Sequence, residues 1–204
     1  MKVPRSLQQL LTLLICCWSI VVIAQNEHWV ENKALQKIKL ENSRGQKFKL
    51  RDIDLYKGAV FVFLYPECPL SIKYTKTLNE LYERFSEEQI LFVGIIPGTD
   101  YSKATVEQFK KTYRLKFDLF LDAEYELSRV LDAKCTPEVF LTDPWGGVQY
   151  SGAIDDRAAS LGQFKDNASE EYLLLALEKW LMNEPIWPKE TKSVGCIIEV
   201  PQKP

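Results

Sequence analysis

Residues 59–71 of this chain read AVFVFLYPECPLS, and this stretch decides the fold. Residues 59–65 form a continuous apolar run of strand-forming residues, which is typical of a central β-strand covered on both faces. A helical pattern follows, because Tyr74, Leu78 and Phe85 recur at the spacing of one helix face. Cys68 therefore lies at the junction where a buried strand ends and a helix begins.

The position of Cys68 is that of a reactive thiol. Pro69 falls at the first position of the helix, where proline is favoured because its missing N–H leaves no donor unpaired. A sulfur just before that position faces unpaired backbone N–H groups and the positive end of the helix dipole, and both stabilise a thiolate. A buried structural cysteine is the alternative interpretation. The flanking Pro66 and Glu67 set Cys68 outside the apolar run, so we predict an activated nucleophile with a lowered pKa.

The N-terminal residues have the pattern of a secretory signal. Lys2 and Arg5 precede an apolar run over residues 10–24, which is shorter than the roughly 20 residues that a membrane-spanning helix needs. Small and branched residues lead up to Ala24, as at a signal-peptidase site. We therefore expect residues 1–24 to be a signal peptide cleaved near Ala24, and the protein to be exported, periplasmic or secreted. An uncleaved membrane anchor is the alternative.

Charge and cysteine content restrict the function further. The full sequence carries 26 Lys and Arg residues against 28 Asp and Glu residues, a net charge of −2 without the basic patch that nucleic-acid binding requires. Cys68, Cys135 and Cys196 follow the predicted signal. Disulfides persist in an oxidising compartment, so this odd number leaves at least one thiol unpaired or paired between chains.

The remaining patterns predict one α/β domain over residues 35–184. Strands are expected at 38–53 (as an N-terminal β-hairpin), 59–65, 90–96, 117–121, 139–142 and 148–150, and helices at 74–85, 102–113, 124–131 and 170–182. This order indicates a central mixed β-sheet flanked by helices. The charged residues 155–157 are interpreted as a solvated turn; a role in orienting the loop beside the active corner is the alternative. Residues 185–204 form a proline-containing C-terminal tail that holds Cys196.

Four motifs resemble those of thioredoxin-like redoxins, the family that joins alkyl hydroperoxide reductase/thiol-specific antioxidant (AhpC/TSA) proteins with secreted thiol-disulfide oxidoreductases. Residues 68–71, CPLS, are similar to the active-site corner, and residues 136–140, TPEVF, to a Thr-Pro step whose proline is cis and faces the active cysteine. Residues 150–156, YSGAIDD, and 194–198, VGCII, resemble an exported bacterial branch. The likeness covers about residues 35–199. It implies a thioredoxin-like fold and a substrate groove formed by Pro69, Ser71, Thr136 and Pro137.

Three departures from the family pattern narrow the expected chemistry. Ser71 stands where thioredoxin-type reductants carry a second cysteine, and a hydroxyl cannot resolve a mixed disulfide within this corner. Phe61 and Tyr65 stand where peroxiredoxins carry Pro and Thr, which removes the usual peroxide pocket. Ile72 replaces the second cysteine of copper-carrying relatives, and the single histidine, His28, lies near the N-terminus. The same lack of histidine disfavours a Cys-His hydrolase. We therefore expect no metal and no cofactor.

A resolving thiol must then come from elsewhere in the chain or from outside it. Cys196 is the first candidate, because a tail after the last helix can fold back across the domain; a structural partner, or none, is the alternative. Cys135 is the second candidate, because the proposed cis-proline turn brings it near Cys68. A strand entrance is also a common place for a buried, inert cysteine. A Cys135–Cys196 bond that leaves Cys68 free remains a further alternative.

Three functions are compatible with these features. The leading hypothesis is a thiol-disulfide oxidoreductase in which Cys68 is the single attacking thiolate, with protein disulfides and a thiol reductant as partners. A thiol peroxidase with antioxidant activity, forming a sulfenic acid on Cys68, is the second. A non-catalytic thioredoxin-fold binding or chaperone module is the third, and Ser71 favours it because a corner with one cysteine captures partners more readily than it releases them. Contact with a membrane is expected only through an uncleaved signal.

Overall fold

The computed structural model describes residues 37–160 and 162–201. The predicted signal peptide and its cleavage near Ala24 lie outside the described residues, so both remain predictions. His28 also lies outside the described residues. Within the described ranges, no helix is both long enough and apolar enough to cross a membrane.

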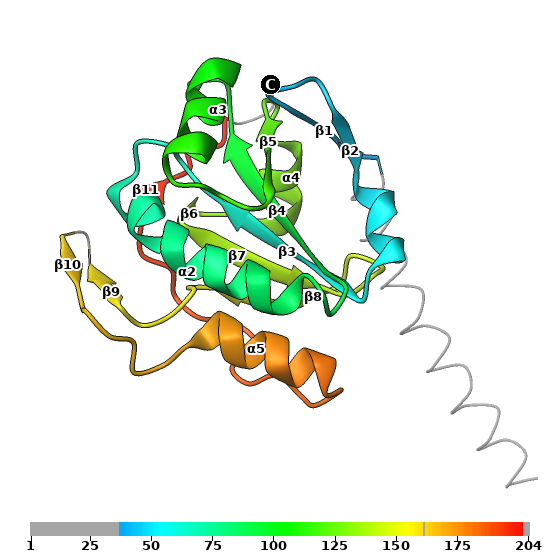
Figure 1. Cartoon of the computed structure of the whole chain (residues 1–204), viewed down its shortest axis with the longest axis vertical. Helices are drawn as coiled ribbons and strands as arrows, with labels where there is room; N and C mark the ends of the chain where they lie inside the picture. The colour runs from blue at the N-terminus through cyan, green and yellow to red at the C-terminus, as the bar shows by residue number, and fades with distance from the viewer. Residues whose placement is uncertain (1–36, 161, 202–204) are drawn as a thin grey trace, which may run out of the picture.

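A seven-stranded mixed sheet forms the centre of the domain, in the strand order β2-β1-β5-β4-β3-β7-β8 (Figure 1). Its strands are β1 (Lys39–Asn42), β2 (Lys47–Lys49), β3 (Gly58–Phe63), β4 (Ile90–Pro97), β5 (Asp118–Asp122), β7 (Glu138–Thr142) and β8 (Val148–Gly152). Strands β3, β4 and β5 run parallel, and β7 pairs antiparallel with β3. Every residue of β3 is buried, as its uninterrupted apolar run predicts.

Helices cover both faces of this sheet. They are α2 (Pro69–Phe85), α3 (Lys103–Thr112), α4 (Glu126–Leu131) and α5 (Tyr172–Leu181), together with the short 3-10 helix η1 (Leu50–Leu55). Apolar side chains of α2, α3 and α5 share one core with the sheet, and those of η1 and α4 share a second core on the other face. The four predicted helices are confirmed.

One predicted strand segment is wrong. Residues 50–53 form the first part of η1 and not the end of a hairpin strand. In a 3-10 helix, side chains three positions apart point the same way. Leu50 and Ile53 therefore both reach the core, which an extended strand in this place would not allow because it would turn one of them outward.

Four very short strands complete the structure and were not predicted. Strands β9 (Ala158–Ser160) and β10 (Gln163–Phe164) form a small hairpin, and β6 (Cys135–Thr136) pairs with β11 (Cys196–Ile197). In Figure 1 the red C-terminal segment returns past α2 to lie beside β6. The tail thus crosses the domain and supplies a strand next to the start of α2.

Asp155 and Arg157 are not part of a solvated turn but form a largely buried ionic anchor on α2. Asp155 is only 4% exposed and accepts hydrogen bonds from the Tyr74 hydroxyl and from Arg157 Nε, the latter at 2.8 Å. Arg157 also donates to the Thr77 hydroxyl at 2.6 Å. A carboxylate can leave water in this way only because a cation and donors replace its hydration. Tyr74 and Thr77 belong to α2, so the anchor ties this loop to the helix that begins next to Cys68.

We expect Asp155→Ala to lower the free energy of unfolding by about 3 kcal/mol, because Arg157 would be left partly buried without its counter-charge. Tyr74→Phe is the matched control: it removes one hydrogen bond, keeps the ion pair, and should cost about 1 kcal/mol. Urea denaturation of both variants measures the difference. Equal, small losses would mean that the loop is solvated after all.

Candidate active site

Cys68 occupies the position that the sequence predicts. It is the N-cap residue of α2, and Pro69 is the first residue of the helix. Its thiol is 3% exposed and donates a hydrogen bond to the carbonyl oxygen of Thr136 at 3.0 Å. The Thr136–Pro137 peptide bond is cis, as the resemblance implies. The end of β3 and the turn between β6 and β7 therefore meet at the Cys68 sulfur.

Cys196 lies against Cys68. Its thiol donates to the Cys68 sulfur, and the two sulfur atoms are 2.6 Å apart. The antiparallel pairing of β11 with β6 sets Cys196 opposite Thr136 and Ile197 opposite Cys135. The tail is held further by the Ile198 N–H, which donates to the Lys134 carbonyl at 2.9 Å. Cys68, Cys135 and Cys196 are all free thiols in this structure, so the docking of the tail, and not a disulfide, brings Cys196 to Cys68.

Gly195 is a site residue that the sequence analysis missed. A Cβ atom at this position would lie 2.0 Å from the Thr136 carbonyl oxygen and 2.6 Å from its carbon. No real Cβ approaches backbone atoms so closely, so only glycine allows the tail to lie this near to β6. The signal for it was its place immediately before Cys196 in the motif at 194–198.

The surroundings of the two sulfurs separate their pKa values. Burial of Cys68 favours the neutral thiol, but the Cys196 thiol, the N–H groups of Ser71 and Cys196, and the Thr136 side chain together lower its pKa below the ordinary value. Burial, and then the neighbouring Cys68 sulfur, raise the pKa of Cys196 to about 12. When the pair loses one proton, Cys68 therefore carries the negative charge and Cys196 keeps its hydrogen.

Thr136 supplies an unused donor at this point. Its side chain is fully buried, and its hydroxyl makes no hydrogen bond to any of the residues that the structure describes. A buried hydroxyl without a partner is uncommon and needs an explanation. Its place beside Cys68 provides one, because a thiolate is a much stronger acceptor than a neutral thiol.

Cys135 has the environment of an inert thiol. It is buried, and this burial, followed by the nearby Glu138 carboxylate, raises its pKa to about 12. Glu138 is itself buried, and its carboxylate accepts a hydrogen bond from the Lys134 N–H at 2.7 Å, which fixes the turn before β7. A thiol held in the neutral form is a poor nucleophile, so Cys135 is the weaker of the two candidates for resolving an intermediate.

The predicted substrate groove needs a correction. Ser71 does not line an open surface: it is fully buried, and its hydroxyl accepts a hydrogen bond from the Tyr65 N–H at 3.2 Å. It closes the loop between β3 and α2, because a buried hydroxyl and a buried N–H satisfy each other there. Pro69 is exposed, whereas Thr136 and Pro137 are buried. Strand β11 pairs along β6 directly before Pro137 and covers this part of the groove.

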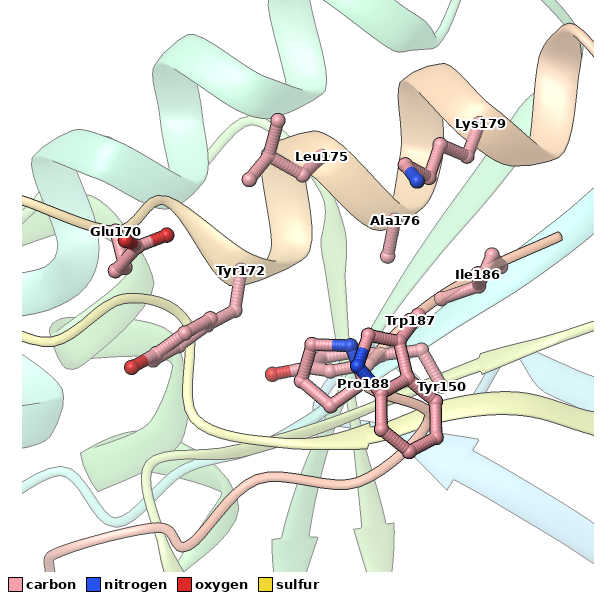
Figure 2. A pocket seen from close by; sticks show the side chains of 9 residues that line it. All are labelled: Tyr150, Glu170, Tyr172, Leu175, Ala176, Lys179, Ile186, Trp187 and Pro188. Atoms are coloured by element: carbon pink, nitrogen blue, oxygen red, sulfur yellow. The ribbon is translucent and has the colours of Figure 1, made fainter. Parts of the chain in front are cut away.

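A separate hollow of about 350 Å³ lies between α5 and the segment 186–188, open to solvent (Figure 2). It is lined by Tyr150, Glu170, Tyr172, Leu175, Ala176, Lys179, Ile186, Trp187 and Pro188. No thiol and none of the predicted site residues face it. Among residues 37–160 and 162–201, no group of three or more His, Cys, Asp or Glu side chains is arranged to hold a metal ion. The candidate active site is therefore the cysteine pair.

Known proteins share both sequence and fold with this chain. Residues 31–151 match the model of the AhpC/TSA family. The thiol-disulfide oxidoreductase ResA of Bacillus subtilis is 27% identical over 143 residues, which cover 68% of this chain and 78% of that protein. ResA of Bacillus cereus is 25% identical over 154 residues, covering 72% of this chain and 87% of that protein.

Two solved structures show the fold. A hypothetical protein from Sinorhizobium meliloti superposes with a TM-score of 0.71 at 21% identity, covering 79% of this chain and 89% of that one. A secreted disulfide oxidoreductase from Mycobacterium tuberculosis superposes with a TM-score of 0.51 at 19% identity, covering 74% and 98%. The predicted thioredoxin-like architecture, a central mixed sheet flanked by helices, is confirmed.

We expect Cys68 to ionise first when the reduced protein is titrated and followed by its ultraviolet thiolate absorbance. In a Cys135→Ser background, Cys196→Ala should raise the Cys68 pKa, since it removes a donor that stabilises the thiolate. Cys196→Ser keeps a hydroxyl donor and should raise it less. A Cys68 pKa that stays unchanged in Cys196→Ala would contradict the assigned donor.

Proposed function

This chain belongs to the AhpC/TSA family, and we propose that it is a thiol-disulfide oxidoreductase in which Cys68 attacks and Cys196 resolves. The observation that carries the proposal is the contact between the Cys196 thiol and the Cys68 sulfur, 2.6 Å apart. The names of the ResA relatives from two Bacillus species support the class of reaction. The resolving thiol that Ser71 cannot provide is thus supplied by the tail.

The reaction has two exchange steps. The Cys68 thiolate attacks one sulfur of a substrate disulfide, the substrate S–S bond breaks, and one substrate thiolate leaves and takes a proton from solvent. Cys196 then loses its proton and attacks the Cys68 sulfur of the mixed disulfide, which releases the second substrate thiol. The substrate gains two electrons and two protons, and the protein is left with a Cys68–Cys196 disulfide. An external thiol reductant restores the two thiols.

The order of these steps follows from the charges at the site. The negative charge on Cys68 opposes ionisation of Cys196 and contributes to its raised pKa. Once Cys68 is bound in a mixed disulfide, that charge is gone, so the pKa of Cys196 falls and its thiolate can form. The resolving nucleophile therefore becomes active only after the first step has occurred.

A peroxidase would use the same two sulfurs with another oxidant. Cys68 would be oxidised by a peroxide to a sulfenic acid with release of an alcohol or water, and the Cys196 thiol would then displace water to form the same disulfide. Phe61, however, is fully buried in β3, and Tyr65 packs against Tyr101 with ring centroids 5.4 Å apart. Two aromatic side chains thus stand in the place of the family's proline and threonine, so we favour disulfide exchange.

Turnover of a model disulfide by the full set of cysteine variants tests this proposal. We expect Cys68→Ser to lose at least about a hundredfold in rate, because it removes the nucleophile of the first step. Cys196→Ser should still react once and then accumulate a mixed disulfide on Cys68, which mass spectrometry identifies. Cys135→Ser is the matched control and should stay near the wild-type rate.

Hydrogen peroxide in place of the disulfide separates the alternatives. Faster consumption of peroxide than of disulfide, with a sulfenic acid on Cys68 in the Cys196→Ser variant, would identify a peroxidase. If Cys68→Ser changes neither the disulfide rate nor the peroxide rate, Cys68 does not catalyse either reaction, and a binding module would remain as the function.

We also infer that the protein works outside the cytoplasm, and the charged, apolar and small-residue pattern of residues 1–24 supports this. When the full chain is expressed in a Gram-negative host, the periplasmic fraction should contain a protein that begins at Gln25. N-terminal mass mapping measures this directly. An intact chain recovered only from the cytoplasm would contradict export, and one retained in the membrane would indicate an uncleaved anchor.

A further inference from the structure

The docked tail closes the site that the proposed reaction needs open. The Cys68 side chain is 3% exposed, and the Cys196 sulfur lies directly against it. A disulfide in a protein is carried on a folded chain and must approach the attacking sulfur in line with the bond that breaks. No such approach exists while Cys196 covers Cys68. The following inference rests on the proposed function and concerns how a protein substrate reaches this sulfur.

The part of the chain that must leave is small and has few attachments. We name residues 194–198 the tail strand. It pairs with β6 through two residues, and the Ile198 N–H adds one hydrogen bond to the Lys134 carbonyl. Ile198 is 6% exposed and belongs to the core on the α4 face, whereas Ile197 points outward and is 74% exposed. Within the tail strand, one side chain and one short backbone ladder make the attachment; just beyond it, Val200 packs against the same core and the Pro201 carbonyl accepts a hydrogen bond from Arg129 at 3.2 Å.

Departure of the tail strand uncovers a binding edge beside the nucleophile. Among the strands that the structure describes, β6 pairs only with β11, so Thr136 loses its strand pairing and the Lys134 carbonyl loses the Ile198 N–H together. An unpaired strand edge accepts an extended peptide through main-chain hydrogen bonds, and side-chain sites along it give specificity. The same movement exposes the Cys68 sulfur and the place that Ile198 fills.

We propose that the substrate polypeptide replaces the tail strand. It binds as an extended strand along β6, with its disulfide sulfur in the place of the Cys196 sulfur. The tail strand then occupies the site as a substrate segment would, and its residues indicate which substrate sequence the β6 edge prefers. The partner is a cysteine-containing segment that is extended or can become so, and not a folded surface of particular charge.

Three positions of the tail strand define the preferred segment. Before the cysteine there is room only for glycine, since a Cβ would meet the Thr136 carbonyl oxygen at 2.0 Å. The residue after the cysteine points to solvent, as Ile197 does, and is free to vary. The next residue enters the core in the place of Ile198 and must be aliphatic. The preferred segment is Gly-Cys, then any residue, then an aliphatic residue.

Strand replacement also couples the second step to product release. The substrate strand and the tail strand compete for one edge, so the tail strand can bring Cys196 to the mixed disulfide only by displacing the substrate strand. Attack by Cys196 on the Cys68 sulfur breaks the bond to the substrate sulfur, which leaves as a thiol. The reduced segment then has neither its covalent bond nor its backbone pairing.

Two synthetic peptides test the inference on the full chain. One has the sequence of residues 192–200, KSVGCIIEV, and the other has alanine in place of its glycine; each carries its cysteine as a 2-thiopyridyl disulfide. Cys196→Ser prevents resolution, and adding Ile198→Asp to it releases the tail strand. The Cys68 thiolate displaces pyridine-2-thione, whose absorbance gives the rate of mixed-disulfide formation, and mass spectrometry confirms Cys68 as the site.

We expect the glycine peptide to react roughly tenfold or more faster than the alanine peptide when the tail strand is released, because overpacking against β6 opposes the alanine. We also expect the glycine peptide to react roughly tenfold faster with the released variant than with Cys196→Ser alone, since the docked tail strand reduces the competent fraction. Equal rates for the two peptides, or no gain on release, would overturn strand replacement.

A second release variant and a small disulfide keep these outcomes distinct. Gly195→Ala, also combined with Cys196→Ser, displaces the tail strand from β6 without a charge in the core and serves if Ile198→Asp fails to fold. Glutathione disulfide, which needs no strand edge, reports the reactivity of Cys68 alone. If it fails to react with either released variant, the proposed function is wrong. If it reacts while the peptides show no preference, only strand replacement is wrong.

Discussion

The pairing of two residues of β11 with two residues of β6 is the constraint on which the site depends. It sets Cys196 against Cys68, covers Thr136 and carries Ile198 into the core. Two paired residues are marginal as a sheet. Burial of one isoleucine contributes about 1.5–3 kcal/mol more. The tail is thus held firmly enough to define a geometry and weakly enough for the exchange that we propose, and its close contact with β6 depends on the missing side chain of Gly195.

The chemistry of the pair arises from two opposed effects on one sulfur. Burial alone would make Cys68 a weak acid, as it does for Cys135 in the neighbouring strand. The helix N-terminus, the Thr136 side chain and the Cys196 thiol reverse that effect at Cys68 only. The difference between the two buried cysteines therefore comes from the donors around each sulfur and not from their exposure.

The strands and helices with long periodic patterns could be predicted from the sequence, and so could the position of Cys68 between β3 and α2. The pairing of β11 with β6 could not, because a two-residue strand has no period to detect. Gly195 matters because it has no Cβ atom to clash with the Thr136 carbonyl oxygen, which is far away in the chain. The burial of Asp155 likewise depends on Tyr74, 81 positions earlier. The sequence patterns indicated which residues carry chemistry, while contacts across the chain determined how they are arranged.

Cys196 follows Cys68 by 128 positions in the chain. Chains emerge from the ribosome with the N-terminus first, and domains begin to fold before synthesis ends. The nucleophile and the β6 edge are therefore complete before their cover has been made. In that interval, under the proposed function, the chain has the attacking thiol Cys68 and an unpaired β6 edge but lacks the resolving thiol Cys196. Under the proposed function, a chain in this state would hold a captured partner until Cys196 reaches the site.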